Sequence, residues 1–68
     1  MVNNFSINLR KLRLQHNLKQ SDLASKIGET QRKVSYWESG KIEPDIRALM
    51  LLSAFFEISI DDLIKDKV

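Results

Sequence analysis

Apolar residues recur at helical spacing in the N-terminal part of the chain. Phe5, Leu9 and Leu12 stand at positions i, i+4 and i+7 with basic residues between them, which predicts an amphipathic helix of about three turns. Asn4 is placed to cap the start of this helix. Asn17 is placed to end it, because asparagine tolerates the left-handed conformation that often follows a helix.

Two shorter helices with a glycine turn between them are predicted next. The first covers Gln20–Ile27 and is ended by Gly28, since glycine adopts the left-handed conformation without steric cost. The second covers Gln31–Ser39, with Thr30 as a good N-cap and Gly40 as its end. The pattern therefore indicates a helix, a short turn and a helix.

Two more helices are predicted in the C-terminal part. Pro44 disfavours helix in the residue before it, and Asp45 can cap a helix over 46–56. Ser59 begins a sequence that resembles a capping box and predicts a brief helix over 60–64. Neither alternating strand patterns nor Asn-Gly or Asp-Gly turns occur. The predicted fold class is all-α, a compact four- to five-helix bundle.

The composition indicates one small domain and excludes several classes of site. Its 68 residues, 43% hydrophobic and 29% charged, fit one small domain over 1–68. The absence of cysteine excludes disulfides, thiolate metal sites and cysteine nucleophiles. The longest stretch with few charges, 48–56, falls far short of the roughly 20 residues of a membrane span. The start has no signal-peptide pattern, so a cytoplasmic protein is expected.

Charge is divided unevenly along the sequence. Residues 1–41 hold eight Lys and Arg against three acids, whereas residues 42–68 hold three against six. The first part therefore carries +5 and the second −3. A basic half joined to an acidic half suggests that one surface meets a polyanion, although small domains often show such asymmetry by chance.

The helix predicted over 31–39 has only two inward apolar residues, Val34 and Trp37. The opposite side presents the polar groups of Arg32, Ser35, Tyr36 and Ser39, and Gln31 and Lys33 flank it near the start of the helix. In the major groove, glutamine can form hydrogen bonds with adenine and arginine with guanine, and a tyrosine ring can contact a thymine methyl group. The alternative is an ordinary polar helix face. The short glycine turn before this helix favours DNA, because it lets the helix protrude into a groove.

The sequence also resembles a known family. The residues that carry the resemblance are Leu18-Lys19-Gln20-Ser21-Asp22-Leu23-Ala24, Ile27-Gly28, Thr30, Val34, Trp37-Glu38-Ser39-Gly40-Lys41 and Pro44, continuing through Ile58-Ser59-Ile60-Asp61-Asp62-Leu63. This pattern closely resembles the phage-repressor (Cro and lambda-repressor) helix-turn-helix family, also called the XRE family. The resemblance covers nearly the whole chain, with the helix-turn-helix unit at about 20–39.

The resemblance implies a lambda-repressor-like domain that binds operator DNA, usually as a dimer, with the third helix reading bases. By position, the base-contacting residues are Gln31, Arg32, Ser35 and Tyr36, and the phosphate-contacting residues are Lys19, Gln20, Lys33, Ser39 and Lys41. Arg13 and Glu38 match a structural pair that ties the first helix to the end of the third. No cofactor, metal or small-molecule ligand is implied.

Four residues depart from the family pattern. Lys19 occupies the usual Ser or Thr cap position of the second helix, which removes a cap but adds charge near phosphate. Glu29 precedes the recognition helix and is expected to repel phosphates, and Glu43 is acidic where bases are frequent. Glu57 replaces a common C-cap glycine, which puts the sharpness of that corner in doubt.

The helix predicted over 46–56 is apolar on two sides. One side offers Ile46, Leu49, Leu52, Ser53 and Phe56 to the core, and the other carries Ala48, Leu51 and Phe55. A helix that is hydrophobic nearly all round is buried on more than one side. We expect the second side to form a two-fold homodimer interface, which predicts a near-palindromic operator with half-sites about 34 Å apart. The alternative is that the fifth helix or the N-terminal arm covers it.

These observations predict a sequence-specific regulator of transcription that binds double-stranded DNA. Repression is the favoured action, in a prokaryotic, phage or mobile-element setting, because blocking a promoter requires only binding and dimerisation; activation stays open. The alternative is a protein-binding module, such as an antitoxin or anti-repressor, that uses the side with Ala48, Leu51 and Phe55. An enzyme is not expected, since the sequence has no glycine-rich phosphate loop, metal cluster or nucleophile beside a base.

Overall fold

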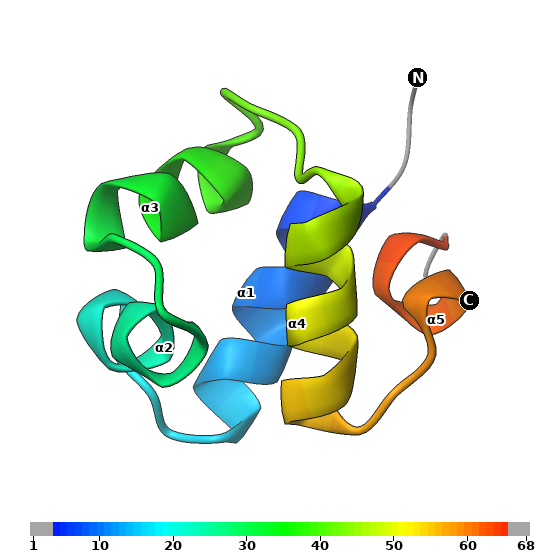
Figure 1. The fold of residues 1–68 in the computed structure, drawn as a ribbon, viewed down its shortest axis with the longest axis horizontal. Helices are drawn as coiled ribbons and strands as arrows, with labels where there is room; N and C mark the ends of the chain where they lie inside the picture. Colours follow the sequence, from blue (N-terminus) through cyan, green and yellow to red (C-terminus); the bar gives the residue numbers. More distant parts are fainter. Residues whose placement is uncertain (1–3, 66–68) are drawn as a thin grey trace.

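Helices make up most of the fold. The computed structural model describes residues 4–65. Its helices are α1 (Phe5–Gln15), α2 (Gln20–Ile27), α3 (Gln31–Ser39), α4 (Ile46–Phe56) and α5 (Ile60–Ile64), as Figure 1 shows. No strand occurs among these residues, which confirms the all-α prediction. None of the helices in this described part has the length and apolar character needed to cross a membrane.

The helices form two groups around a shared core. α2 packs against α3, and α1 packs against both α3 and α5. α4 packs against α2 and α5. Figure 1 shows α2 and α3 on one side of α1 and α4, and α5 on the other. The outer side of α3 is therefore remote from α5.

Local hydrogen bonds explain most helix starts. Thr30, Asp45 and Ser59 each accept a bond from the backbone N–H three residues later, at 3.2, 2.8 and 2.9 Å, as predicted. The predicted cap at Asn4 is wrong, because its side chain makes no capping bond. Its backbone has ψ of 25° rather than the extended value that aims a capping side chain at the helix. Its N–H instead donates to the carbonyl of Ile64, at 3.1 Å.

The helix ends use left-handed backbone, with and without glycine. Gly28 and Gly40 have φ of 74° and 79°, and Asn17 has φ of 58°, as expected beyond the end of α1. Glu57 also takes this conformation, with φ of 56°. Two bonds to Ser53 hold that corner: the backbone N–H of Ile58 donates to the Ser53 carbonyl, and Ser53 Oγ donates to the Ile58 carbonyl. The corner is therefore formed despite the missing glycine.

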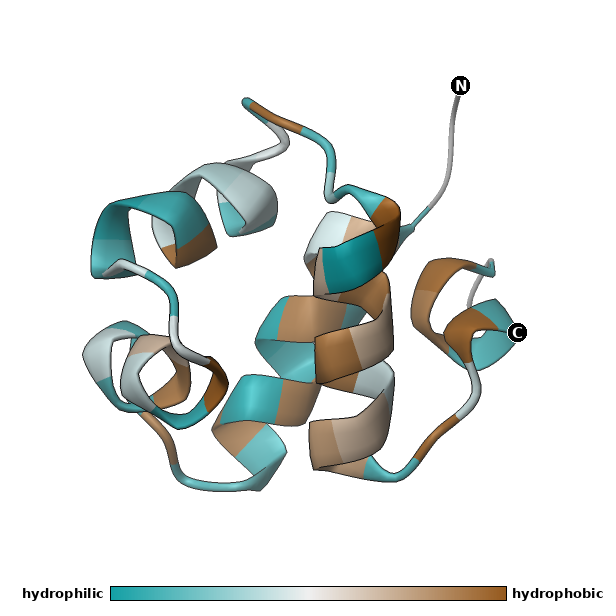
Figure 2. Ribbon diagram, in the orientation of Figure 1, coloured by the Kyte–Doolittle hydropathy of each residue, from teal (hydrophilic) through white to brown (hydrophobic). Residues whose placement is uncertain are grey.

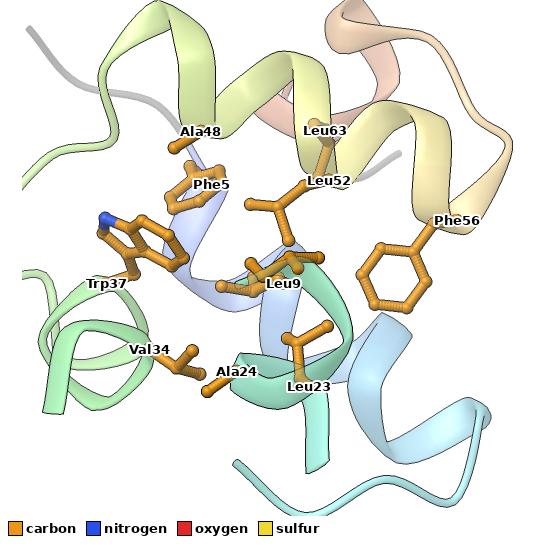
Figure 3. Close-up of a cluster of buried hydrophobic side chains, with 11 residues drawn as sticks. Phe5, Leu9, Leu23, Ala24, Val34, Trp37, Ala48, Leu52, Phe56 and Leu63 are labelled. Carbon is orange, nitrogen blue, oxygen red and sulfur yellow. The ribbon is translucent and has the colours of Figure 1, made fainter. Parts of the chain in front are cut away.

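The core lies where all five helices meet. Figure 3 shows its side chains converging from every helix. The side chains of lowest exposure are Leu9, Leu23, Val34, Trp37, Leu52 and Leu63. Trp37 lies edge-on to Phe5, with ring centroids 6.3 Å apart. Trp37 on the inward side of α3 therefore fixes this helix to α1.

The buried side of α4 differs from the prediction. Ile46, expected in the core, is 74% exposed, whereas Ala48, expected at a dimer interface, is 2% exposed. Because α4 packs against α2 and α5, the spacing i, i+4, i+8 of Ala48, Leu52 and Phe56 faces inward. Figure 2 shows how much of α4 and α5 is strongly hydrophobic.

The remaining residues of the expected interface are partly covered. Leu51 and Phe55 are half-buried and pack against the core. The side that bears Ala48 is thus mostly occupied within the chain itself. The N-terminal arm of residues 1–3, which was an alternative cover for this side, lies outside the described residues.

A side-chain amide joins the two ends of the fold. Asn8 Nδ2 donates to the backbone carbonyls of Leu63 and Lys65, at 3.0 and 2.9 Å. These carbonyls lie at the end of α5, where a helix has no internal partner for them. Asn8 therefore fastens the short α5 to α1, a tie that the sequence pattern did not indicate.

Candidate nucleic-acid interface

α3 separates an inward apolar face from an outward polar face. Val34 and Trp37 point into the core, at 0% and 1% exposure, as predicted (Figure 3). On the other side Gln31, Arg32 and Ser39 are exposed, and Lys33, Ser35 and Tyr36 are half-buried. Gln31, Arg32, Ser35, Tyr36 and Ser39 therefore lie on the side of α3 away from the core, with Lys33 at the edge of that side.

Two of the residues predicted to contact bases, Gln31 and Arg32, are exposed on α3. Within residues 4–65, the side chains of Gln31 and Arg32 make no hydrogen bond or ion pair. Arg32 lies opposite the midpoint between Val34 and Trp37 on the helix. An arginine in this position can extend its planar donors directly away from the protein surface.

Neighbouring groups at the end of α3 are already ordered. Ser39 Oγ donates to the backbone carbonyl of Tyr36 at 3.2 Å. The ammonium of Lys41 lies 5.2 Å from the centroid of the Tyr36 ring, within the range of a cation–π interaction. Tyr36 and Lys41, assigned from the sequence to bases and phosphate respectively, thus contact each other and form one surface.

A nearly buried ion pair lies behind this surface. Arg13 donates to both carboxylate oxygens of Glu38, through Nε at 2.6 Å and Nη2 at 3.0 Å. Arg13 Nη1 also donates to the backbone carbonyl of Leu18, at 2.8 Å. The hydrogen bonds to Glu38 raise the pKa of Arg13 above its ordinary value. The pair expected from the sequence therefore fixes α1 to α3 and to the loop before α2.

Gln20 belongs to the same network. Its Nε2 donates to Glu38 Oε1 at 3.1 Å, and the residue is half-buried. A glutamine amide carries two hydrogens, so one stays available for another acceptor. The sequence placed Gln20 near phosphate but gave no sign of its bond to Glu38, because the two residues are 18 positions apart.

The start of α2 lacks a side-chain cap from Lys19, as expected. The backbone N–H of Lys19 nevertheless donates to Asp22 Oδ2 at 2.9 Å. This bond is one arm of a capping box, with aspartate in place of the usual glutamate. The Lys19 side chain is therefore not needed to start the helix and remains exposed.

Glu29 has a different environment from the one expected. Its side chain is only 14% exposed, and its carboxylate lies 3.8 Å from Lys33 Nζ and 3.4 Å from Arg47 Nη1. Its charge is therefore balanced from α3 and from α4. Arg47 was missed in the sequence because it stands 18 residues from Glu29 and outside the helix-turn-helix pattern.

Known proteins are similar to this chain in sequence. A family model described as helix-turn-helix matches residues 9–63. The uncharacterized HTH-type transcriptional regulator YqaE of Bacillus subtilis is 39% identical over 61 residues, which cover 90% of the chain and 53% of that protein. The HTH-type transcriptional activator BcrR of Enterococcus faecalis is 38% identical over 60 residues, or 88% of the chain and 29% of that protein. The chain thus spans about half or less of these relatives.

Solved structures give the same picture. The P22 c2 repressor, crystallised with a synthetic operator, has a TM-score of 0.86 and 27% identity, and the match covers 93% of this chain and 96% of the crystallised repressor chain. Hydroxypropylphosphonic acid epoxidase of S. wedmorenis has a TM-score of 0.80 and 31% identity, but only 32% of its chain is covered. The fold therefore occurs both as a repressor domain and as one part of a larger enzyme.

Proposed function

The chain belongs to the helix-turn-helix family of transcriptional regulators, and from this membership we propose that it reads a specific double-stranded DNA sequence with α3. The observation that carries the proposal is the outward face of α3, where the side chains of Gln31 and Arg32 are exposed and without partners among residues 4–65. An α-helix fits the major groove, and both side chains can bond base edges there. Lys19, Gln20, Lys33, Ser39 and Lys41 are proposed to contact phosphates around it.

We propose further that the protein acts as a cytoplasmic repressor. Support comes from the likeness to the P22 c2 repressor over nearly the full length of the crystallised repressor chain. Binding alone can block a promoter, whereas activation requires an additional favourable contact with the transcription machinery. A reporter gene placed behind an operator selected from a random DNA pool tests whether the protein represses or activates. Repression lowers expression when the protein is supplied, and a rise in expression would contradict the proposal.

Arg32→Ala should weaken binding to the operator selectively. A bidentate contact to guanine discriminates by about 1–3 kcal/mol, so the variant is expected to lose affinity for the selected site and to tolerate more bases at one position. The measurement is a titration of the operator, obtained by selection from a random DNA pool, and of a random duplex of equal length. Arg32 is exposed, so folding should be unchanged.

Lys33→Ala is the matched comparison on the same helix. It should weaken both duplexes alike, because a phosphate contact carries no sequence information. Equal losses on operator and random DNA for Arg32→Ala would contradict its assignment to a base. If the unaltered protein showed no salt-sensitive binding to any duplex, the alternative of a protein-binding module would replace DNA recognition.

A homodimer on a near-palindromic operator completes the proposal. With Ala48 in the core, the proposed interface keeps the half-buried Leu51 and Phe55 and adds the exposed Ala54, which follows Leu51 by one helical turn. Ala54→Glu should favour monomers, because it places a charge at the contact without entering the core. Sedimentation should show the unaltered chain as a dimer and the variant as a monomer, with equal helix content. A monomeric unaltered chain would rule out a preformed dimer.

A further inference from the structure

Three charged side chains from three parts of the fold meet beside the start of α3. Glu29 lies in the turn before the helix, Lys33 lies in its first turns, and Arg47 lies at the start of α4. We call these three residues the Glu29 cluster. Lys33 and Arg47 approach different oxygens of the same carboxylate, Oε1 and Oε2. The guanidinium of Arg47 is thus held next to a lysine already assigned to DNA phosphate.

The cluster is held weakly on its cationic side. The side chains of Arg47 and Lys33 are 71% and 42% exposed, and their distances to Glu29 are 3.4 and 3.8 Å. Ion pairs with cations this exposed contribute little to stability, so another anion can take over either cation. The Arg13–Glu38 pair is shorter, at 2.6 Å, and its side chains are only 10% and 4% exposed. Arg13 is therefore committed to the fold, whereas Arg47 is free to exchange partners.

We propose that Arg47 is a further phosphate-contacting residue, and that Glu29 holds Arg47 and Lys33 together as one phosphate-binding pair beside α3. This inference rests on the proposed DNA binding through α3. In the free protein the two cations share the carboxylate of Glu29. On DNA, a backbone phosphate replaces the carboxylate as their partner, so Glu29 lowers the affinity for every duplex.

The geometry explains how an acidic residue is tolerated at this position. A lone carboxylate ahead of a DNA-reading helix would repel the phosphates on both sides of the groove. Here the carboxylate is mostly covered, at 14% exposure, and two cations stand nearer to solvent than it does. An approaching duplex therefore meets the positive groups first.

The test compares Arg47→Gln with Lys65→Gln. Both variants lose one positive charge, but Lys65 follows α5, on the other side of the molecule from α3 (Figure 1). Affinities of the selected operator and of a random duplex are measured over a range of salt concentrations. The logarithm of the affinity falls as the logarithm of the salt concentration rises. Arg47→Gln should make this fall shallower by about one on both duplexes, whereas Lys65→Gln should leave it unchanged.

The outcomes separate this inference from the proposed function. If the unaltered protein bound neither duplex, the proposed function itself would fail. If it bound both but Arg47→Gln matched Lys65→Gln, DNA binding would stand and the role of Arg47 would be overturned. Circular dichroism of both variants should match the unaltered chain, because both side chains are exposed.

Glu29→Gln tests the proposed role of the carboxylate. It should raise the affinity for both duplexes by about two- to fivefold, the range expected when an exposed ion pair no longer competes. In a chain that also carries Lys33→Gln and Arg47→Gln, the same change should have little effect, because no cation remains to be released. An equal rise in both backgrounds would show that Glu29 acts only by general repulsion and would overturn the cluster.

Discussion

Glu38→Ala is expected to lower the free energy of unfolding by about 3–5 kcal/mol, because it leaves the guanidinium of Arg13 buried without its counter-charge. Arg13 is 8% exposed, and three of the hydrogen bonds that order this region end on the Glu38 carboxylate. Domains gain about 0.05–0.15 kcal/mol per residue, which gives a 68-residue chain only about 3–10 kcal/mol in total. The loss is therefore a large share of the total, and the variant should unfold at a much lower urea concentration than the unaltered chain.

Urea unfolding followed by circular dichroism measures this loss. Asp62→Asn is the control, since it removes a pair with Lys65 of 2.8 Å that is about half-exposed on both sides and should hardly move the midpoint. Glu38→Gln preserves the shape but not the charge, and should fall between the two. A midpoint for Glu38→Ala equal to that of Asp62→Asn would show that the buried network contributes nothing to stability.

The same network links stability to recognition. Glu38 lies in α3 and accepts hydrogen bonds from Arg13 of α1 and Gln20 of α2. It therefore connects the three helices that carry the proposed interface. An isolated interaction at the surface could not do this, because its side chains would be free to move apart. The hydrogen bond to Glu38 thus holds the Gln20 side chain in place for its proposed contact with a phosphate.

Features set by neighbouring residues could be predicted from the sequence. The bounds of α2, α3 and α4 follow from caps such as Thr30 and Asp45 and from the glycines that end two of these helices. Each of these signals acts within one helical turn. The inward positions of Val34 and Trp37 could also be predicted, because no aliphatic residue on the rest of α3 competes with them for the core.

Features set by packing could not be predicted. α4 is apolar nearly all round, so its sequence did not show that Ala48 faces inward and Ile46 faces solvent; the positions of α2 and α5 decide this. The bonds of Asn8 to the end of α5 and of Arg47 to Glu29 join residues that are distant in the sequence. The Asn4 cap failed for a similar reason, since its N–H is drawn to the end of α5.

Trp37→Ala is the core substitution expected to affect both folding and recognition. The side chain is 1% exposed and packs edge-on against Phe5, directly beneath the outward face of α3. Removing a buried aromatic side chain costs about 3–5 kcal/mol, since the surrounding helices only partly close the cavity. The variant should unfold far more easily than the unaltered chain, and operator, which binds only the folded state, should restore part of its helix.

Trp37→Phe separates loss of volume from loss of the aromatic contact. The indole Nε1 of Trp37 makes no hydrogen bond within residues 4–65, so phenylalanine removes a buried polar group as well as some packing. The two effects oppose each other, and the variant should retain most of its stability and its operator affinity. In thermal unfolding, the operator should then raise the midpoint of Trp37→Phe as it does for the unaltered chain. If Trp37→Ala unfolded no more easily than the surface variant Arg32→Ala, the anchoring of α3 through Trp37 would be refuted.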